Sequence, residues 1–319
     1  INYSMQEMAE NAVLTHMPRL QKEFFEQNET LDDSIAPFRE LTSGAVDTLL
    51  RISMRRSERW RKMKYDLKKD NEEIEESFFV PKEMTVFSWE GEIDTIMTPL
   101  DSMKYYKSFF RPGMMSMDPT NGYIKAWVGG MNYRHFQYDM VKKGKRQIGS
   151  TFKPFVYAAA IDQLKLSPCD TFPDSQFCIE KNKFGNVEQW CPKNSGDRYG
   201  RTRTLKNALA NSVNTVTARL MDRIGPRTVV KLAKDLGIEQ RILPVPSIAL
   251  GTPDLSVYEM VAAYSTFANK GVYTQPVFIE RIEDKNGTTL FENKPVTRDV
   301  LSEEAAYVTV NLLEGVTKA

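Results

Sequence analysis

The chain has 319 residues, of which 41% are hydrophobic and 27% are charged. This is the composition of a globular protein that can bury a sizeable core. Its 43 basic and 42 acidic residues leave a formal charge of +1, a balance that argues against general nucleic-acid binding. No uninterrupted apolar stretch approaches the roughly 18 residues of a membrane-spanning helix. The chain opens on Ile1-Asn2-Tyr3, with neither an initiator methionine nor a signal peptide, so we expect a fragment whose membrane anchor lies upstream.

The first third of the chain has helical periodicity. Apolar residues recur at spacings of three and four up to Pro18, which predicts a helix that ends there. A second helical stretch is predicted at about residues 44 to 69. Its apolar first half passes into the highly charged run Arg55 to Glu76, which is typical of a solvated face or a linker.

Strand patterns begin after Ser77. Residues 84–89 and 92–97 predict two strands joined by a turn. Thr98-Pro99 predicts the start of a helix that reaches about Phe110. Further along, the patterns predict a hairpin at 113–128, a helix at 150–164, an irregular stretch at 165–200, helices near 204–222, 226–236, 255–269 and 302–314, and a hairpin between 277 and 291. Because strands arrive as hairpins, the order of elements favours an α+β fold over a doubly wound parallel sheet.

Three cysteines lie in the irregular stretch. Cys169, Cys178 and Cys191 do not form a C-x-x-C pattern, and the chain has only two histidines, so no metal site is predicted. A disulfide between Cys178 and Cys191 and three unpaired thiols are both open interpretations. Cysteine content therefore does not settle the compartment.

The segment from Gln147 to Pro154 carries the clearest chemical signal. Ser150 and Lys153 are three residues apart, so on a helix their side chains share one face. Pro154 indicates that the helix begins close to Ser150, because proline is tolerated in a first turn, where no backbone donor is missed. That start places Ser150 at the positive end of the helix dipole, where backbone N–H groups can hold an oxyanion.

The rest of this helix, residues 155–161, is apolar enough to be buried. Burial disfavours a charged amine, so we expect a lowered pKa for Lys153. A serine beside a neutral lysine is an activated nucleophile. The spacing alone is weak evidence, since it arises by chance about once in a chain of this size. A serine that merely caps a helix is the competing interpretation.

A second polar motif interrupts the helical pattern near residue 212. Asn211-Ser212-Val213-Asn214 contains residues that compete with backbone hydrogen bonding and so favour turns. The motif is open to two interpretations: a simple interhelical turn, or a short loop that brings the Ser212 hydroxyl and the Asn214 amide to the cleft.

Together these motifs resemble the transpeptidase domain of class A penicillin-binding proteins, the bifunctional peptidoglycan synthases. The resemblance covers roughly residues 77–319. Residues 1–76 resemble the helical linker that follows a glycosyltransferase domain. The matching segments are Met117-Asp118-Pro119 to Gly130, Gly149 to Pro154, Trp190 to Asn194, Leu209 to Asn214, Ala249-Leu250-Gly251, and Leu255 to Gly271.

The resemblance implies an α/β fold of α+β type, with an antiparallel sheet covered by helices on both faces. It implies a D,D-transpeptidase that attacks D-Ala-D-Ala ends of peptidoglycan stem peptides, is acylated by β-lactams, and needs no cofactor. Ser150 is then the nucleophile, Lys153 its base, Ser212 a proton relay, and Asn214 a ligand of Lys153 and of the substrate. Gly149, Trp190 and Asn194 are the implied substrate-binding residues.

The resemblance also implies a location and partners. The protein is expected outside the cytoplasm, on the periplasmic face of a bacterial inner membrane, held there by an upstream anchor. Other cell-wall synthesis proteins are its expected partners. One departure is clear: the third motif of the family, Lys-Thr/Ser-Gly, does not occur in the sequence. We expect it beyond Ala319.

Two alternatives remain open. The first is another serine acyl enzyme with the same pair, a D-Ala-D-Ala carboxypeptidase or a β-lactamase; the helical N-terminal region and the segment Trp190–Asn194 count against it. The second is a non-catalytic module that binds cell wall or senses β-lactams, an interpretation that the missing third motif supports.

Overall fold

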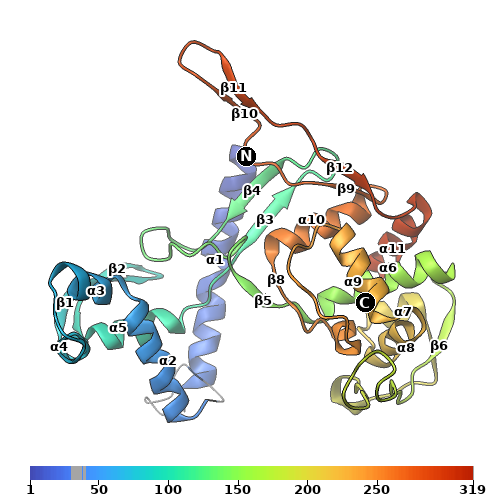
Figure 1. Cartoon of the computed structure of the whole chain (residues 1–319), viewed down its shortest axis with the longest axis horizontal. Coiled ribbons are helices and arrows are strands. Elements are labelled where there is room, and N and C mark those ends of the chain that lie inside the picture. Colours follow the sequence, from blue (N-terminus) through green and yellow to red (C-terminus); the bar gives the residue numbers. More distant parts are fainter. Residues whose placement is uncertain (30–37, 39–40, 319) are drawn as a thin grey trace. The chain divides into compact units, whose positions relative to one another are not determined.

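The computed structural model describes residues 1–29, 38 and 41–318 (Figure 1). It divides into two compact units. The first unit consists of Ile1–Ala9, Gly113–Gly129 and Tyr138–Ala319, and the second of Glu10–Pro112 and Gly130–Gln137. Every residue that the sequence singled out for chemistry belongs to the first unit. Residues 30–37, 39 and 40 of the predicted linker lie outside the described residues.

Helix α1 (Tyr3–Asn28) is longer than the sequence predicted, because it continues through Pro18. A proline inside a helix removes one backbone hydrogen bond, so contacts elsewhere must hold the second half. Gln21 supplies two of them: its side chain donates to the Ser108 carbonyl over 2.9 Å and accepts from the Phe110 N–H over 2.9 Å. The prediction that this helix ends at Pro18 was therefore wrong.

The rest of the second unit follows the predicted order of elements. These are α2 (Ser43–Arg56), α3 (Glu58–Arg61), the π-helical turn η1 (Lys62–Asp66), α4 (Asn71–Glu76), β1 (Lys82–Ser88), β2 (Gly91–Met97) and α5 (Pro99–Ser108). Ser57 ends α2 and caps α3 by accepting from the Trp60 N–H, so the predicted second helix is interrupted. The β1–β2 hairpin is confirmed, as is the helix start, where Thr98 accepts from the Asp101 N–H. Aromatic rings of Phe87, Phe109 and Phe136 form the core here.

The first unit holds most of the helices. They are η2 (Gly149–Phe152), α6 (Lys153–Leu164), η3 (Ser195–Asp197), α7 (Leu205–Ala210), α8 (Asn214–Ile224), α9 (Pro226–Asp235), η4 (Pro246–Leu250), α10 (Val257–Ala268) and α11 (Glu303–Val316). The predicted helices at 150–164, 226–236, 255–269 and 302–314 are confirmed, and the one at 204–222 is split in two. Across the described chain, no helix is at once long enough and apolar enough to cross a membrane.

The strands of the first unit are short. They are β3 (Met114–Met117), β4 (Ile124–Val128), β5 (Lys145–Gln147), β6 (Thr171–Pro173), β7 (Thr202–Thr204), β8 (Asp254–Ser256), β9 (Val272–Thr274), β10 (Arg281–Glu283), β11 (Thr289–Glu292) and β12 (Thr297–Asp299). The hairpins β3–β4 and β10–β11 are confirmed. Among the described residues the strands form antiparallel pairs, including the unpredicted pairs β5–β8, β6–β7 and β9–β12.

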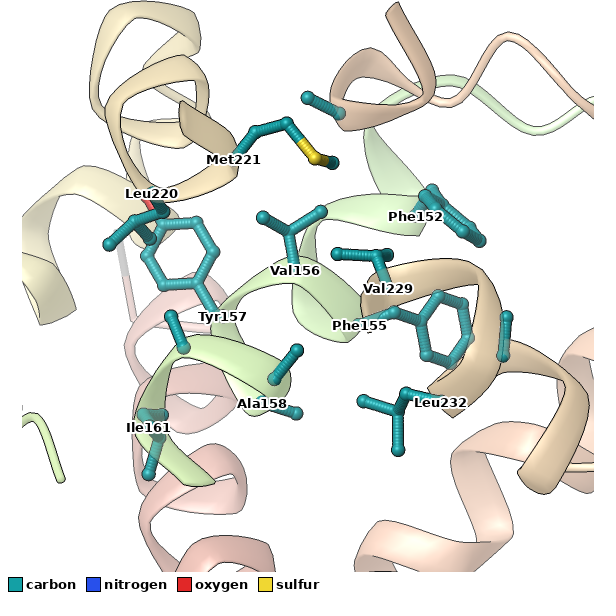
Figure 2. Close-up of a cluster of buried hydrophobic side chains, with 14 of the residues drawn as sticks. Phe152, Phe155, Val156, Tyr157, Ala158, Ile161, Leu220, Met221, Val229 and Leu232 are labelled. Carbon is teal, nitrogen blue, oxygen red and sulfur yellow. The ribbon is translucent and has the colours of Figure 1, made fainter. Parts of the chain in front are cut away.

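Helix α6 is the centre of the first unit, where it packs against α8, α9 and α11 (Figure 1). Every residue of α6 from Lys153 to Ile161 is buried. Figure 2 shows Phe155, Val156 and Tyr157 projecting from this helix among side chains of α8 and α9. The core therefore packs against α6 on all sides, and this close packing holds the first turn of the helix in place.

Candidate active site

Ser150 lies in η2, the tight turn that leads into α6, and its side chain is exposed. Its carbonyl accepts a hydrogen bond from the Lys153 N–H. The turn is 3₁₀-helical and becomes α-helical only at Lys153, as often happens at a helix N-terminus. The structure thus gives Ser150 solvent access at the start of a helix whose remainder is buried.

A close contact between two glycines fixes the backbone in front of Ser150. Gly149 has φ +56° and Gly251 has φ +72°, both in the left-handed region that favours glycine. The Gly149 N–H donates to the Gly251 carbonyl over 2.9 Å. A Cβ on Gly251 would lie 1.8 Å from the Gly149 carbonyl oxygen, so only glycine fits there. This constraint was not predicted from the sequence.

Lys153 is the most notable ionisable residue of α6, because its side chain is only 1% exposed. Its Nζ lies 2.6 Å from the Ser212 carbonyl oxygen, 2.8 Å from the Ser212 Oγ and 2.6 Å from the Asn214 Oδ1. Three acceptors match the three N–H donors of an ammonium group. Within the described part of the chain, no carboxylate lies at ion-pairing distance from this amine.

Burial lowers the pKa of Lys153 from its ordinary value of 10.5 to about 8. The cause is desolvation, which disfavours the charged form of an amine. The neutral fraction near neutral pH is therefore larger than that of an ordinary lysine, and a neutral amine can accept a proton. The Ser212 hydroxyl accepts a hydrogen bond from Nζ when Lys153 is protonated, and it can donate one to Nζ when Lys153 is neutral.

The loop between α7 and α8 presents Ser212 to this amine. Ser212 has φ +51°, a left-handed conformation that costs a non-glycine residue roughly 1–2 kcal/mol. The conformation lets both the carbonyl and the hydroxyl of Ser212 reach Lys153. Backbone strain of this kind occurs often at functional sites, and here it accompanies the contact between Ser212 and Lys153.

Asn214 is the first residue of α8, and both the oxygen and the nitrogen of its side-chain amide are hydrogen-bonded. The Oδ1 accepts from Lys153, and the Nδ2 donates to the Lys193 carbonyl over 2.7 Å. A carbonyl can only accept and an ammonium can only donate. These two neighbours therefore allow one orientation of the Asn214 amide.

The structure brings Asn194 into the same cluster, but not Trp190. The Asn194 side chain accepts from the Asn214 and Thr215 N–H groups and donates to Asp174 and to the Arg198 carbonyl. Trp190 instead pairs through its backbone with Ile179, and its ring packs against the main core.

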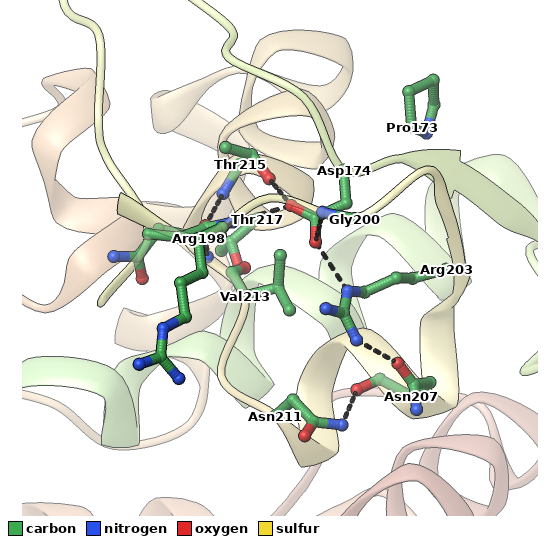
Figure 3. A network of polar contacts seen from close by, with 12 residues as sticks. Pro173, Asp174, Arg198, Gly200, Arg203, Asn207, Asn211, Val213, Thr215 and Thr217 are labelled. Atoms are coloured by element: carbon green, nitrogen blue, oxygen red, sulfur yellow. Dashed lines mark hydrogen bonds and ion pairs between the residues drawn. The ribbon is translucent and has the colours of Figure 1, made fainter. Parts of the chain in front are cut away.

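One buried carboxylate beside this cluster was not predicted from the sequence. Asp174 is fully buried in a polar network (Figure 3). No pattern in the irregular stretch identifies it, since a lone aspartate after a proline is typical of any turn.

Cys178 and Cys191 form a disulfide, while Cys169 is unpaired and exposed. The structure thereby decides between the two interpretations of the cysteines.

An apolar cavity of about 680 Å³ lies beside η2 and α10. Ile148 and Thr151, which flank the Gly149-Ser150 pair, are among its lining residues, together with Met260 and Tyr264. The side chains of Lys153, Ser212 and Asn214 face each other and do not line it. In the described residues, no three His, Cys, Asp or Glu side chains are grouped as a metal ion would need.

The chain matches two known family models. Residues 112–319 match the penicillin binding protein transpeptidase domain, and residues 33–110 match the penicillin-binding protein middle domain. The chain therefore belongs to the penicillin-binding proteins and carries their transpeptidase domain, with the mixed α+β fold that the sequence predicted.

Individual relatives are similar over about two thirds of the chain. It is 36% identical over 206 residues to penicillin-binding protein 1A of Aquifex aeolicus and 35% identical over 204 residues to penicillin-binding protein 2D of Bacillus subtilis. Each alignment covers 64% of this chain, but only 27% and 29% of those relatives. The crystal structure of penicillin-binding protein 1A from Haemophilus influenzae superimposes with a TM-score of 0.59 at 27% identity, over 64% of this chain and 35% of that one.

Proposed function

We propose that this chain is the D,D-transpeptidase part of a peptidoglycan synthase, with Ser150 as its nucleophile. The observation that carries the proposal is the buried Lys153 amine, which is held by Ser212 and Asn214 one turn away from an exposed serine. Burial leaves the amine partly neutral near pH 8, as a base that accepts a serine proton must be.

The proposed reaction has two steps. The Ser150 Oγ attacks the carbonyl carbon of the penultimate D-Ala of a stem peptide, and Lys153 takes the hydroxyl proton. The C–N bond to the terminal D-Ala then breaks, and Ser212 passes a proton to the leaving nitrogen. An amine of a second stem peptide attacks the acyl ester, which forms the cross-link and returns the proton to Ser150.

The proposed roles of the other predicted site residues have different degrees of support. Asn214 accepts a hydrogen bond from Lys153, which supports its proposed role as a ligand of the base and of the substrate backbone. Gly149, Trp190 and Asn194 stay predictions as substrate-binding residues. The Gly149 N–H and the Asn194 amide already have partners within the protein, which favours an orienting role for these two.

The wider context is also a proposal. Residues 1–76 are proposed to link residues 77–319 to a glycosyltransferase domain of a bifunctional protein. The site is proposed to work outside the cytoplasm, at the periplasmic face of the inner membrane, with other cell-wall synthesis proteins as partners. β-Lactams are the proposed inhibitors, and the solved penicillin-binding protein A of Mycobacterium tuberculosis, which shares this fold, is described as an acyl-enzyme complex with ceftriaxone.

Labelling with a fluorescent penicillin separates the proposed function from its rivals. The chain is incubated with the compound, and both the protein-bound fluorescence and the hydrolysed drug are followed over time. A stable stoichiometric adduct is expected. Rapid turnover of the drug would indicate a β-lactamase, and the absence of any covalent adduct would leave a non-catalytic binding module.

A further inference from the structure

Asp174 is the most deeply buried carboxylate beside the Lys153 cluster, with no exposed surface. Its Oδ2 accepts from the Arg203 Nε over 2.6 Å and from the Gly200 N–H over 2.9 Å. Its Oδ1 accepts from the Thr215 hydroxyl over 2.8 Å and from the Asn194 Nδ2 over 2.7 Å. Figure 3 shows Asp174 between Arg203 on one side and Thr215 on the other.

The surrounding hydrogen bonds favour the ionised form of this carboxylate. Burial alone would raise the pKa of Asp174, but hydrogen bonds from Arg203, Thr215, Asn194 and the Gly200 N–H together hold it below its ordinary value. A buried charge is retained at a cost unless it is paired and hydrogen-bonded. Four donors from three separate segments satisfy that condition.

Asn194 transmits the position of Asp174 to the start of α8. The residue before this helix is Val213, whose side chain cannot cap it. Asn194 supplies the missing acceptor from another segment: its Oδ1 lies 3.0 Å from the Asn214 N and 3.2 Å from the Thr215 N. Its Nδ2 meanwhile donates to Asp174 and to the Arg198 carbonyl, so these two acceptors together set which end of the Asn194 amide faces the helix.

Asn214 is the first residue of α8 and does not cap its own helix. Asparagine at a helix start commonly bonds to the local backbone. Here the cap comes from Asn194, and the Asn214 side chain spans instead from the Lys193 carbonyl to the Lys153 amine. Lys193 and Asn194 are neighbours, so one segment both caps α8 and orients the Asn214 amide.

We propose, on the basis of the proposed acylation at Ser150, that Asp174 is a positioning residue for this reaction. It acts through Asn194, which caps α8, while the carbonyl of the neighbouring Lys193 orients the Asn214 amide so that its oxygen faces the Lys153 amine. Thr215 is the second contact of Asp174 with the same helix turn. Asp174 itself touches neither Ser150 nor Lys153.

The test follows the titration of Lys153 by NMR of side-chain-labelled lysine, with its signal assigned through the Lys153→Arg variant. Asp174→Asn keeps the shape of the side chain but removes the charge and reverses one hydrogen bond. The expected result is a lower titration midpoint for Lys153, because its protonated form loses a fixed acceptor. Penicillin acylation should also slow by roughly 10- to 100-fold, the scale of a small displacement of reacting groups.

Matched variants separate positioning from general loss of structure. Thr215→Val removes one hydroxyl donor to Asp174, whereas Thr217→Val removes a hydroxyl that bonds within the same helix. Asp222→Asn removes a carboxylate of α8 whose partner is Lys183. Thr215→Val should change the Lys153 midpoint in the same direction as Asp174→Asn, and the other two variants should leave it unchanged. If Asp174→Asn does not fold, the Lys153 titration midpoint of Thr215→Val tests the proposal instead.

A double substitution gives the second readout. In an Asn214→Ala background, Asp174→Asn should slow acylation no further, because residues that act through one another are not additive. A folded Asp174→Asn protein with the parent midpoint and the parent acylation rate would overturn the proposal. So would fully additive effects in the double variant. Since the titration needs no reaction, it tests positioning even if the unmodified chain fails to acylate, a failure that would count against the proposed function alone.

Discussion

Lys153 combines two properties that rarely occur together in one lysine: full burial and the absence of a carboxylate partner among the described residues. Hydrogen bonds from its amine go to Ser212 and Asn214. The unpaired burial is what lowers its pKa, and the three acceptors are what keep the amine in place. A structural lysine would instead extend its charged end to solvent.

The pH dependence of acylation follows from this residue. Lys153 must be neutral to take the serine proton, and burial lowers its pKa to about 8. The acylation rate constant should therefore fall about tenfold per pH unit below pH 8 and level off above it. It is measured with a fluorescent penicillin from pH 6 to pH 9. A flat profile across this range would show that another group accepts the proton.

The same pKa shift predicts the direction of a stability change. The amine binds a proton less tightly in the folded protein than in the unfolded chain, where its pKa is near 10.5. Between pH 8 and pH 10.5 the unfolded chain therefore binds more protons, and this group makes the free energy of unfolding rise with pH. Below about pH 8 the penalty is fully present. Urea unfolding of the parent and of Lys153→Met across this window should show the rise in the parent only.

Lys153→Arg tests whether the residue acts as a base or only as a cation. Arginine stays protonated at any accessible pH, so acylation should fall by roughly 10²- to 10⁴-fold, the usual contribution of a general base. Lys165→Arg, at the other end of α6 and exposed, is the matched control and should acylate normally. Retention of most of the rate in Lys153→Arg would assign the proton to another acceptor.

At the scale of elements, the turn before α6 depends on the contact between Gly149 and Gly251. Gly251→Ala would place a Cβ 1.8 Å from the Gly149 oxygen and should displace the turn that holds Ser150. Acylation should fall about 100-fold, as expected for a small misplacement of the nucleophile. The rate is compared with that of Gly287→Ala.

Gly287 is a close control because it also has a positive φ, +82°, but no atom within 4 Å of the added Cβ. Both variants carry the left-handed penalty of roughly 1–2 kcal/mol, whereas only Gly251→Ala carries the clash. Gly287→Ala should therefore lose some stability and no acylation rate. Equal rates in the two variants would mean that the Gly149–Gly251 contact does not position Ser150.

Elements with strong local signals could be predicted from the sequence. The helix from Ser150 was evident because proline and an apolar run mark its start and its burial. The hairpins β1–β2 and β3–β4 were evident from alternation and turn residues. Three-residue strands such as β5 and β8 have too few residues to show a period, and their pairing joins segments that are far apart in the chain.

The candidate site divides in the same way. The spacing of Ser150 and Lys153 is local, so the sequence shows it. The capping of α8 by Asn194, and the burial of Asp174 beneath it, arise only when three distant segments meet. Local patterns also gave a wrong end for α1, since tertiary contacts of Gln21 carry that helix past Pro18.

At the scale of the whole molecule, the disulfide stabilises the long irregular segment that carries Lys193 and Asn194. Cys178 and Cys191 close a loop with a sequence separation of 13, which in the chain-entropy account stabilises the fold by about 3 kcal/mol. Cys178→Ser should lower the free energy of unfolding in urea by this amount. Cys169→Ser, at the unpaired thiol, should not. Equal stabilities would show that the bridge adds nothing to the fold.

Peptide mapping of the penicillin adduct by mass spectrometry tests whether Ser150 is the residue that forms the acyl ester. The chain and its Ser150→Ala variant are treated alike with penicillin, digested and mapped. The variant should remain folded, since Ser150 is exposed and its side chain caps neither η2 nor α6. One adduct is expected, on the peptide that contains Ser150, and none is expected on the variant. An adduct on the folded Ser150→Ala protein, or one mapped to the peptide that contains Ser212, would contradict the assignment of Ser150.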